Sequence, residues 1–456
     1  MTLRQRLGLD GPVAYTSLAR LVSIVGSTGT VLLIAHFLSP IEQGYYYTLS
    51  SLVALQLLFE LGFSFVIQQL AAHECAELQL HADGSVSGDP VAHARLASAL
   101  QLSIRWYTVA ALAMGMVLAP LGMVFFTRHA AGGAPVAWQG PWVAAVVGSM
   151  IGLWFGPCYS FMDGCGQIKA VAAMRFRMAI VGSVLAWSAM LLHHGLYAPA
   201  LMILGQVGTG LHFLSGRRRF LTGLLRHPVG NWAIHWTREV FPFQWRIAVS
   251  WTCSYFTIQV FIPILFAMRG PVEAGQMGMS LSITGYMTGL VLPWISTKTT
   301  PFGRMIAQHE FHGLDRLFLR TLGQALAIFS VIALAACAMS FLLPSVAPHL
   351  AQRMVAPQLF ALLVLAAGAN CVVQSLGTLL RSFKREPFLM QSMVAASLTL
   401  VLAALTARRW GNAGVTLSFL AVSAGVALPL ALSIFFRARR GYLAMDRFIV
   451  IGGEAG

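Results

Sequence analysis

Charged residues are scarce in this chain of 456 residues. They make up 10% of it, whereas hydrophobic residues make up 57%; a typical soluble protein has about 25% charged residues. A water-soluble fold of this length would have to expose much of that apolar side-chain surface to water. The composition therefore excludes a soluble globular protein and predicts an all-α integral membrane protein.

The sequence also lacks the cysteine patterns of disulfide or zinc sites and the motif of an ATP-binding loop. The six cysteines are scattered and form no C-x-x-C pair, which argues against a disulfide framework or a zinc site. No Gly-x-x-x-x-Gly-Lys-Ser/Thr segment is present, so no phosphate loop is available to bind ATP. We expect no metal, no cofactor and no catalytic residue.

One loop contains residues of the types that bind metals. His73, Glu77 and His81 recur at every fourth residue of the segment 71–99. On a helix they would share one face, as metal ligands must, but a further ligand is lacking. We therefore predict a solvated amphipathic helix here rather than a metal site.

Acidic residues are half as numerous as basic ones, which gives a formal net charge of +15. The basic residues lie in short loops between apolar segments, a distribution that sets membrane orientation and does not fit a nucleic-acid groove. Clusters such as Arg217–Arg219 and Arg437–Arg440 fall on one side, and the positive-inside rule places them, with both termini, in the cytoplasm. The outer loops contain only two carboxylates, Glu42 and Glu273.

Stretches of about 20 apolar residues can each cross a bilayer, and the sequence has about twelve of them. The predicted spans are 15–38, 45–70, 100–126, 141–162, 171–192, 196–215, 246–268, 276–296, 318–343, 356–381, 387–407 and 412–436. The basic, Trp-rich segment 216–245 is typical of a linker that lies along lipid headgroups. We therefore predict an N-terminal six-helix bundle over 1–215, a cytoplasmic linker over 216–245 and a C-terminal bundle over 246–456.

An internal repeat supports this division. The segment SPIEQG, with Pro40, Glu42 and Gly44, matches GPVEAG, in which Pro271 stands 231 residues after Pro40. An even number of spans separates the copies, so the two bundles would be parallel repeats related by an axis along the membrane normal.

Few ionisable residues fall within the spans, and a charge in hydrocarbon is costly, so each is a candidate functional group. Glu60 lies well inside the second span, and Arg20 and Arg105 lie near the inner ends of the first and third. In the functional interpretation the two arginines contact a diphosphate or an acidic sugar, with Gln56 beside them, and Glu60 exchanges an ion. In the structural interpretation the arginines reach out to the headgroups and Glu60 neutralises one of them.

The first hairpin resembles a known family. Its turn from Pro40 to Gly44, the aromatic residues Tyr45–Tyr47 and the triplet Glu60-Leu61-Gly62 resemble those of polysaccharide-type flippases of the MATE-like MOP exporter superfamily. The inner-loop segment Asp163–Lys169 also fits this pattern. The resemblance implies two six-helix bundles that lean together as a V around a central cavity.

The resemblance also implies a function. Such a protein would flip a lipid-linked oligosaccharide, or export polysaccharide intermediates, across the bacterial inner membrane by ion-coupled alternating access. A proton or sodium gradient would supply the energy, the undecaprenyl diphosphate-type glycan and membrane lipids would be its partners, and a polymerase or glycosyltransferase could assemble with it. Three alternatives stay open: a multidrug-type cation antiporter, a polytopic glycan-processing enzyme, and a scaffold that transports nothing.

Overall fold

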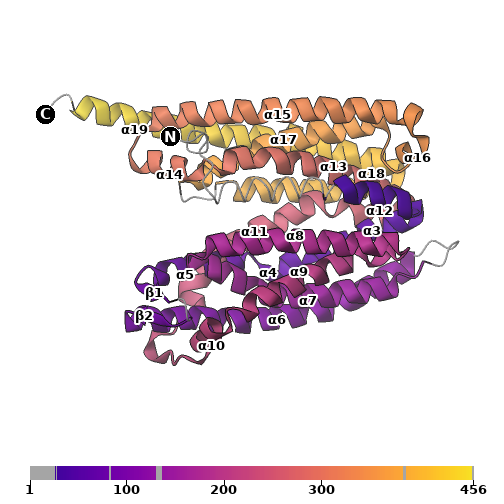
Figure 1. Cartoon of the computed structure of the whole chain (residues 1–456). Coiled ribbons are helices and arrows are strands. Elements are labelled where there is room, and N and C mark those ends of the chain that lie inside the picture. The colour runs from indigo at the N-terminus through magenta and orange to yellow at the C-terminus, as the bar shows by residue number, and fades with distance from the viewer. Residues whose placement is uncertain (1–25, 27, 82–83, 130–135, 384–386, 454–456) are drawn as a thin grey trace, which may run out of the picture. The chain divides into compact units, whose positions relative to one another are not determined.

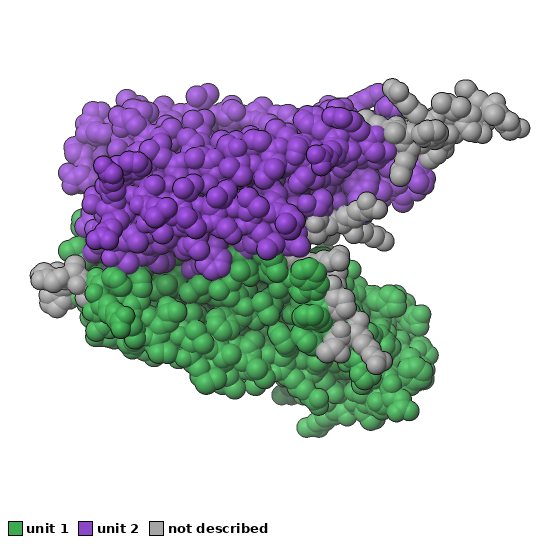
Figure 2. Space-filling model, turned by 180° about the vertical axis from the view of Figure 1, so that it is seen from behind, with its two compact units in different colours: residues 1–252 green, residues 253–456 purple. Residues whose placement is uncertain are grey.

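The computed structural model describes residues 26, 28–81, 84–129, 136–383 and 387–453. Among them, one two-stranded hairpin accompanies an otherwise helical structure (Figure 1). The predicted fold class, an all-α membrane protein, is confirmed. The chain divides into two compact units, residues 1–252 and 253–456, which Figure 2 colours separately. The segment predicted as a linker, 216–245, lies within the first unit.

The first unit contains α3 (Pro40–Val53), α4 (Leu57–Glu60), α5 (Phe63–Cys75), β1 (Leu78–Leu80), β2 (Val86–Gly88), α6 (Pro90–His129), α7 (Gln139–Gly164), α8 (Ile168–Leu191), α9 (Ala198–Ser215) and α10 (Arg218–Arg226). Helix α11 (Phe241–Ile258) crosses the boundary between the units. The second unit continues with α12 (Phe261–Arg269), α13 (Pro271–Ser296), α14 (Thr299–Ala307), α15 (Phe311–Val346), α16 (Pro348–Ala351), α17 (Pro357–Arg381), α18 (Leu389–Val422) and α19 (Leu428–Gly453).

Six helical stretches of the described residues are long and apolar enough to cross a membrane, and a bent pair, Pro40–Glu60 with Phe63–Cys75, makes a seventh. The predicted spans 387–407 and 412–436 form one such stretch, Leu389–Tyr442, which is interrupted at Gly411 where φ is 55°. Large apolar side chains of α15, among them Val331 and Leu334, are exposed. That face suits lipid rather than water, so the chain is a multi-pass membrane protein.

The core of the first unit is aromatic. Helix α7 packs against α5, α6 and α9, and α8 packs against α9. Phe63, Tyr107, Trp142 and Phe161 are fully buried, and the Trp142 indole Nε1 donates a hydrogen bond to the Ala119 carbonyl at 3.1 Å. Burial of such large side chains, with the indole N–H of Trp142 hydrogen-bonded, fixes how α6 and α7 pack.

The loop 71–99 does not form the predicted amphipathic helix. Helix α5 ends at Cys75, and β1 pairs with β2 in an antiparallel hairpin in which Leu80 faces Val86. His73 lies in the helix and His81 follows the strand, so the helix face predicted for His73, Glu77 and His81 is wrong. The physical reason lies in the alternating Leu-Gln-Leu of β1 and in Gly84 and Gly88, whose positive φ values suit a hairpin.

The two copies of the repeated turn use their glutamates differently. Helices α3 and α13 both begin at the repeated proline, Pro40 or Pro271. Glu42 closes a capping box, since it accepts from the Ser39 amide at 2.8 Å while Ser39 caps Glu42. In the second copy Gly270 replaces the capping serine, and Glu273 instead accepts from the amide of Asn412 at 3.0 Å, where α18 is broken.

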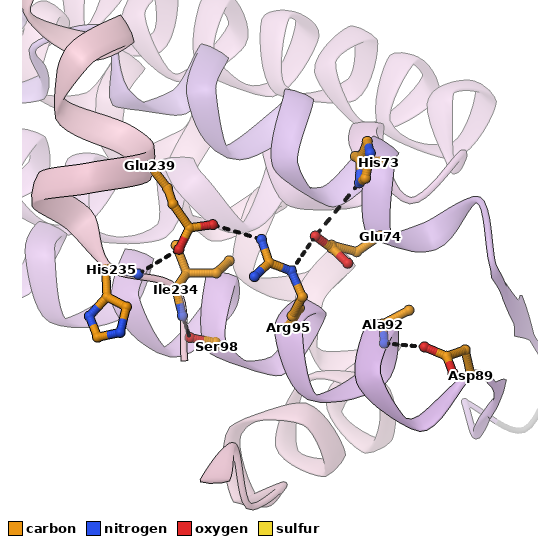
Figure 3. A network of polar contacts seen from close by, with 9 residues as sticks. All are labelled: His73, Glu74, Asp89, Ala92, Arg95, Ser98, Ile234, His235 and Glu239. Atoms are coloured by element: carbon orange, nitrogen blue, oxygen red, sulfur yellow. Dashed lines mark hydrogen bonds and ion pairs between the residues drawn. The ribbon is translucent and has the colours of Figure 1, made fainter. Parts of the chain in front are cut away.

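The segment that follows α10 is bound along α6 by polar contacts (Figure 3). Arg95 of α6 donates to the buried Glu74 of α5 at 2.9 Å and to Glu239 at 2.8 Å. Glu239 also accepts from the His235 amide at 3.0 Å, and the Ile234 amide donates to Ser98 at 2.9 Å. Because one arginine joins two carboxylates from distant parts of the sequence, the contacts hold the chain just before α11.

The Arg95 hydrogen bond also makes this attachment sensitive to acid. It holds the pKa of Glu239 below its usual range. The ion pair therefore stabilises the attachment of this segment fully above the ordinary glutamate pKa of about 4.3, and this stabilisation is lost as the pH falls through the lowered pKa of Glu239. We expect the protection factors of the amides at Ile234–Glu239, which compare each exchange rate with the intrinsic rate at the same pH, to fall on acidification. Glu239→Gln should exchange faster at neutral pH and lose the extra acid response. An unchanged response in the variant would contradict the assignment to Glu239.

Candidate functional site

A helix break lies at the centre of the first unit's second apolar segment. The segments Pro40–Glu60 and Phe63–Cys75 meet at 44°. Between them Leu61 and Gly62 adopt left-handed conformations, with φ of 52° and 65°. The sequence predicted a span over 45–70, and the structure places this break inside it. A non-glycine residue at positive φ costs energy, but Gly62 tolerates the left-handed conformation that the break requires.

The break opens beside a cavity of about 260 Å³ that lies within the first unit. Its lining combines polar and apolar side chains and is almost uncharged: among the described residues it has one carboxylate, and no lysine, arginine or histidine. The lining residues are Gln56, Glu60, Ser64, Tyr107, Ser149, Gly152, Leu153, Gly156, Tyr159, Met178, Ile203, Gln206 and Val207. Helices α4, α5, α6, α7, α8 and α9 therefore all contribute to one site.

Several hydroxyl groups surround the carboxylate. The Ser64 and Tyr107 hydroxyls share a hydrogen bond of 2.9 Å, and Ser64 also interacts with the half-buried Glu60. The Ser149 hydroxyl is buried and has no hydrogen-bond partner among the described residues. A buried hydroxyl without a partner is costly, so the site holds unused hydrogen-bonding capacity for a small polar or charged ligand.

The predicted site residues separate into two groups. Gln56 and Glu60 both line the cavity. Arg105 lies on α6 but is exposed and does not line it, while Tyr107 does; residues two apart on a helix point to different sides. Arg20 lies outside the described residues. The structure thus brings together the carboxylate and the amide and leaves Arg105 apart from them.

Sequence reasoning missed the hydroxyl groups of this site. Ser64, Ser149, Tyr107 and Tyr159 were not singled out, because serine and tyrosine are common in apolar helices and nothing local marks those that face a cavity. Gln206, a polar residue within the predicted span 196–215, also lines the cavity. The one available signal was Gly62, which lies two residues after Glu60 in the sequence and, as a glycine, adopts positive φ without steric cost.

The size of the cavity depends on a close approach at Gly210. A Cβ atom there would collide with the Tyr159 hydroxyl and with Met178, both of which line the cavity. We expect Gly210→Ala to push Tyr159 inward and to lower the free energy of unfolding by about 1–3 kcal/mol, the usual cost of overpacking. Gly208→Ala on the same helix is the control, because nothing lies within 4 Å of its Cβ position. Thermal unfolding in detergent measures both, and equal midpoints would contradict the steric argument.

Comparison with known proteins gives matches to solved structures only. No family model matches the chain, and no curated protein matches its sequence. The structure is similar to an inward-facing multidrug resistance MATE family transporter of the MOP superfamily, with 14% identity and a TM-score of 0.65 over 94% of this chain and 99% of that one.

Two further solved structures extend the comparison. The lipid II flippase MurJ matches with 12% identity and a TM-score of 0.57, over 97% of this chain and 92% of that one. A MOP superfamily transporter from Pyrococcus furiosus matches with 13% identity and a TM-score of 0.56, over 95% and 96%. At these identities the likeness establishes the fold but no substrate. The chain therefore has the fold shared by MATE and other MOP-superfamily transporters.

Proposed function

We propose that this chain is an ion-coupled membrane transporter and that Glu60 is its coupling group. The observation that carries the proposal is the half-buried carboxylate at a helix break, facing a cavity of hydroxyl and amide groups. A carboxylate at membrane depth is a functional group by default, and broken helices are where transporters build their ion and substrate sites.

The chemistry of the cavity limits what it binds. Oxygen ligands from Glu60, Ser64 and Gln56 suit a proton or a hard cation such as sodium. The sequence has no phosphate loop for ATP, so an ion gradient is the energy source of the proposed cycle. Binding of the ion would neutralise Glu60 and change the cost of holding it in the membrane interior.

The proposed substrate is a lipid-linked oligosaccharide, moved from the inner to the outer leaflet of a bacterial inner membrane. Two observations support it: the first hairpin resembles that of polysaccharide-type flippases, and a lipid II flippase is among the similar structures. In this proposal Arg105, which lies outside the Glu60 cavity, contacts the diphosphate, and Arg20, which is not among the described residues, has the role predicted from the sequence. A polymerase or glycosyltransferase that uses the same lipid-linked glycan would be the protein partner.

A multidrug-type antiporter for organic cations is the second candidate. It is favoured by the cavity itself, whose described lining has a carboxylate but no basic residue. Such a lining attracts a cation and offers no positive charge to a diphosphate. The enzyme alternative is less well supported, because both predicted outer carboxylates, Glu42 and Glu273, bond helix ends.

Removal of the coupling charge tests the first proposal. We expect Glu60→Gln to abolish transport while the protein still inserts and accumulates, because glutamine keeps the shape and hydrogen bonding but cannot exchange a proton or neutralise a cation. Glu77→Gln, which removes an exposed carboxylate of the same unit, should transport normally. Normal transport by Glu60→Gln at equal abundance would refute the role of Glu60.

The fate of the glycan distinguishes the two substrates. On deletion of the gene we expect undecaprenyl-linked glycan to accumulate on the inner leaflet, as probed by its accessibility in sealed vesicles of defined orientation. Loss of a sugar linkage would indicate an enzyme instead. An unchanged glycan distribution, together with increased cellular accumulation of organic cations, would favour the antiporter.

A further inference from the structure

A second cavity, of about 660 Å³, lies between the β1–β2 hairpin and α10. Figure 1 shows these elements at one end of the first unit. Its lining consists of Leu80, His81, Gly84, Gln167, Ser215, Gly216, Arg217, Arg218, Arg219 and Phe220. Three consecutive arginines thus face one cavity, and its described lining contains no carboxylate. This end carries the basic loops, which the positive-inside rule assigns to the cytoplasm.

The folding of the chain builds this cavity. Gly84, at φ +89°, brings the end of the hairpin so close to α10 that an added Cβ would lie 3.1 Å from the Phe220 backbone nitrogen. Arg217 is fixed by three contacts: its Nε donates to Gln167 Oε1 at 2.7 Å, its Nη1 donates to the Phe213 carbonyl at 3.3 Å, and its guanidinium lies 3.7 Å from the Phe213 ring centroid. None of these contacts neutralises its charge.

The other two arginines lack even such contacts. Arg218 and Arg219 are exposed, and neither guanidinium has a hydrogen-bond or ion-pair partner among the described residues. Both stand in the first turn of α10, where the positive end of the helix dipole favours acidic residues and disfavours basic ones. Three cations placed against this dipole around a cavity form an arrangement that an anion would stabilise.

The surroundings of the cavity point to lipid as the source of that anion. Helix α10 buries Phe220 and Leu224 and contacts α6, where Gln101 binds the carbonyls of its last turn. Leu225 and Trp232, which follow along the segment, are 40% and 52% exposed. Exposed apolar and indole side chains beside arginines are typical of the headgroup layer.

We propose that this cavity binds the phosphate group of an anionic phospholipid headgroup, with Arg218 and Arg219 as its ligands and Arg217 as a fixed charge behind them. The site is separate from the Glu60 cavity and does not depend on what the protein transports. It would attach the segment before α11 to the inner leaflet through a lipid of defined charge.

Native mass spectrometry of the full chain in detergent, titrated with phosphatidylglycerol or phosphatidylcholine, tests the proposal. We expect one phosphatidylglycerol to bind preferentially. Arg218→Gln/Arg219→Gln should weaken it about thirtyfold, since each arginine near a lipid surface contributes about a factor of five. The matched control is Arg177→Gln/Arg226→Gln, which removes the same charge at exposed positions outside the cavity lining and should bind as the wild type does.

Three further arms make the result decisive. If the double variant does not fold, as judged by thermal unfolding, Arg219→Gln alone should weaken binding about fivefold. Gly84→Val, which disturbs the cavity wall without changing charge, should also weaken binding. Equal losses in the control variant, or full binding by Arg218→Gln/Arg219→Gln, would overturn the site. Displacement of the lipid by inorganic phosphate at similar concentration would overturn the lipid assignment in favour of a soluble phosphate compound.

Discussion

The interior of a membrane offers no water, so every polar group there must bind another group of the protein or face a cavity. In the described part of the chain, the helix break after Glu60 is a costly exception to the regular hydrogen bonding of helices. Leu61 and Gly62 leave the helix within an apolar segment, and the carboxylate faces a lining of hydroxyl and amide groups. An arrangement this costly is retained only where the surrounding helices support it, and six of them do.

The same constraint organises the charges at the helix ends. Asp163 accepts from Arg175 at 2.7 Å, Asp315 accepts from Arg439 at 2.7 Å, and Arg95 joins Glu74 to Glu239. Because basic residues outnumber acidic ones by 30 to 15, such pairing leaves a surplus of arginines. At the junction of α9 and α10, three of these arginines line a cavity. The first unit therefore has an anion-binding end and, separate from it, an interior that carries a carboxylate.

The two halves share a turn but differ in chemistry. The position in the second half that corresponds to Glu60 is Val291, which is fully buried. Glu42 caps its own helix, whereas Glu273 bonds the broken helix α18. A repeated backbone therefore carries different polar networks, because the local partner at each turn, Ser39 or Gly270, decides which groups its glutamate can reach.

The sequence by itself determined the membrane class and the helical fold, and it selected Glu60 and Gln56 as candidates, both of which line the cavity, because apolar length and isolated charges act locally along the chain. It was wrong about the helix at His73–His81, and it left undecided what depends on how distant segments meet. The hairpin that replaced a predicted helix at His73–His81, the separation of Arg105 from Glu60, and the hydroxyls of Ser64, Ser149 and Tyr107 around the carboxylate all depend on packing between helices. Only the tertiary structure decides which face of an apolar helix lines a cavity, since hydropathy is nearly uniform around such a helix and carries no signal of direction.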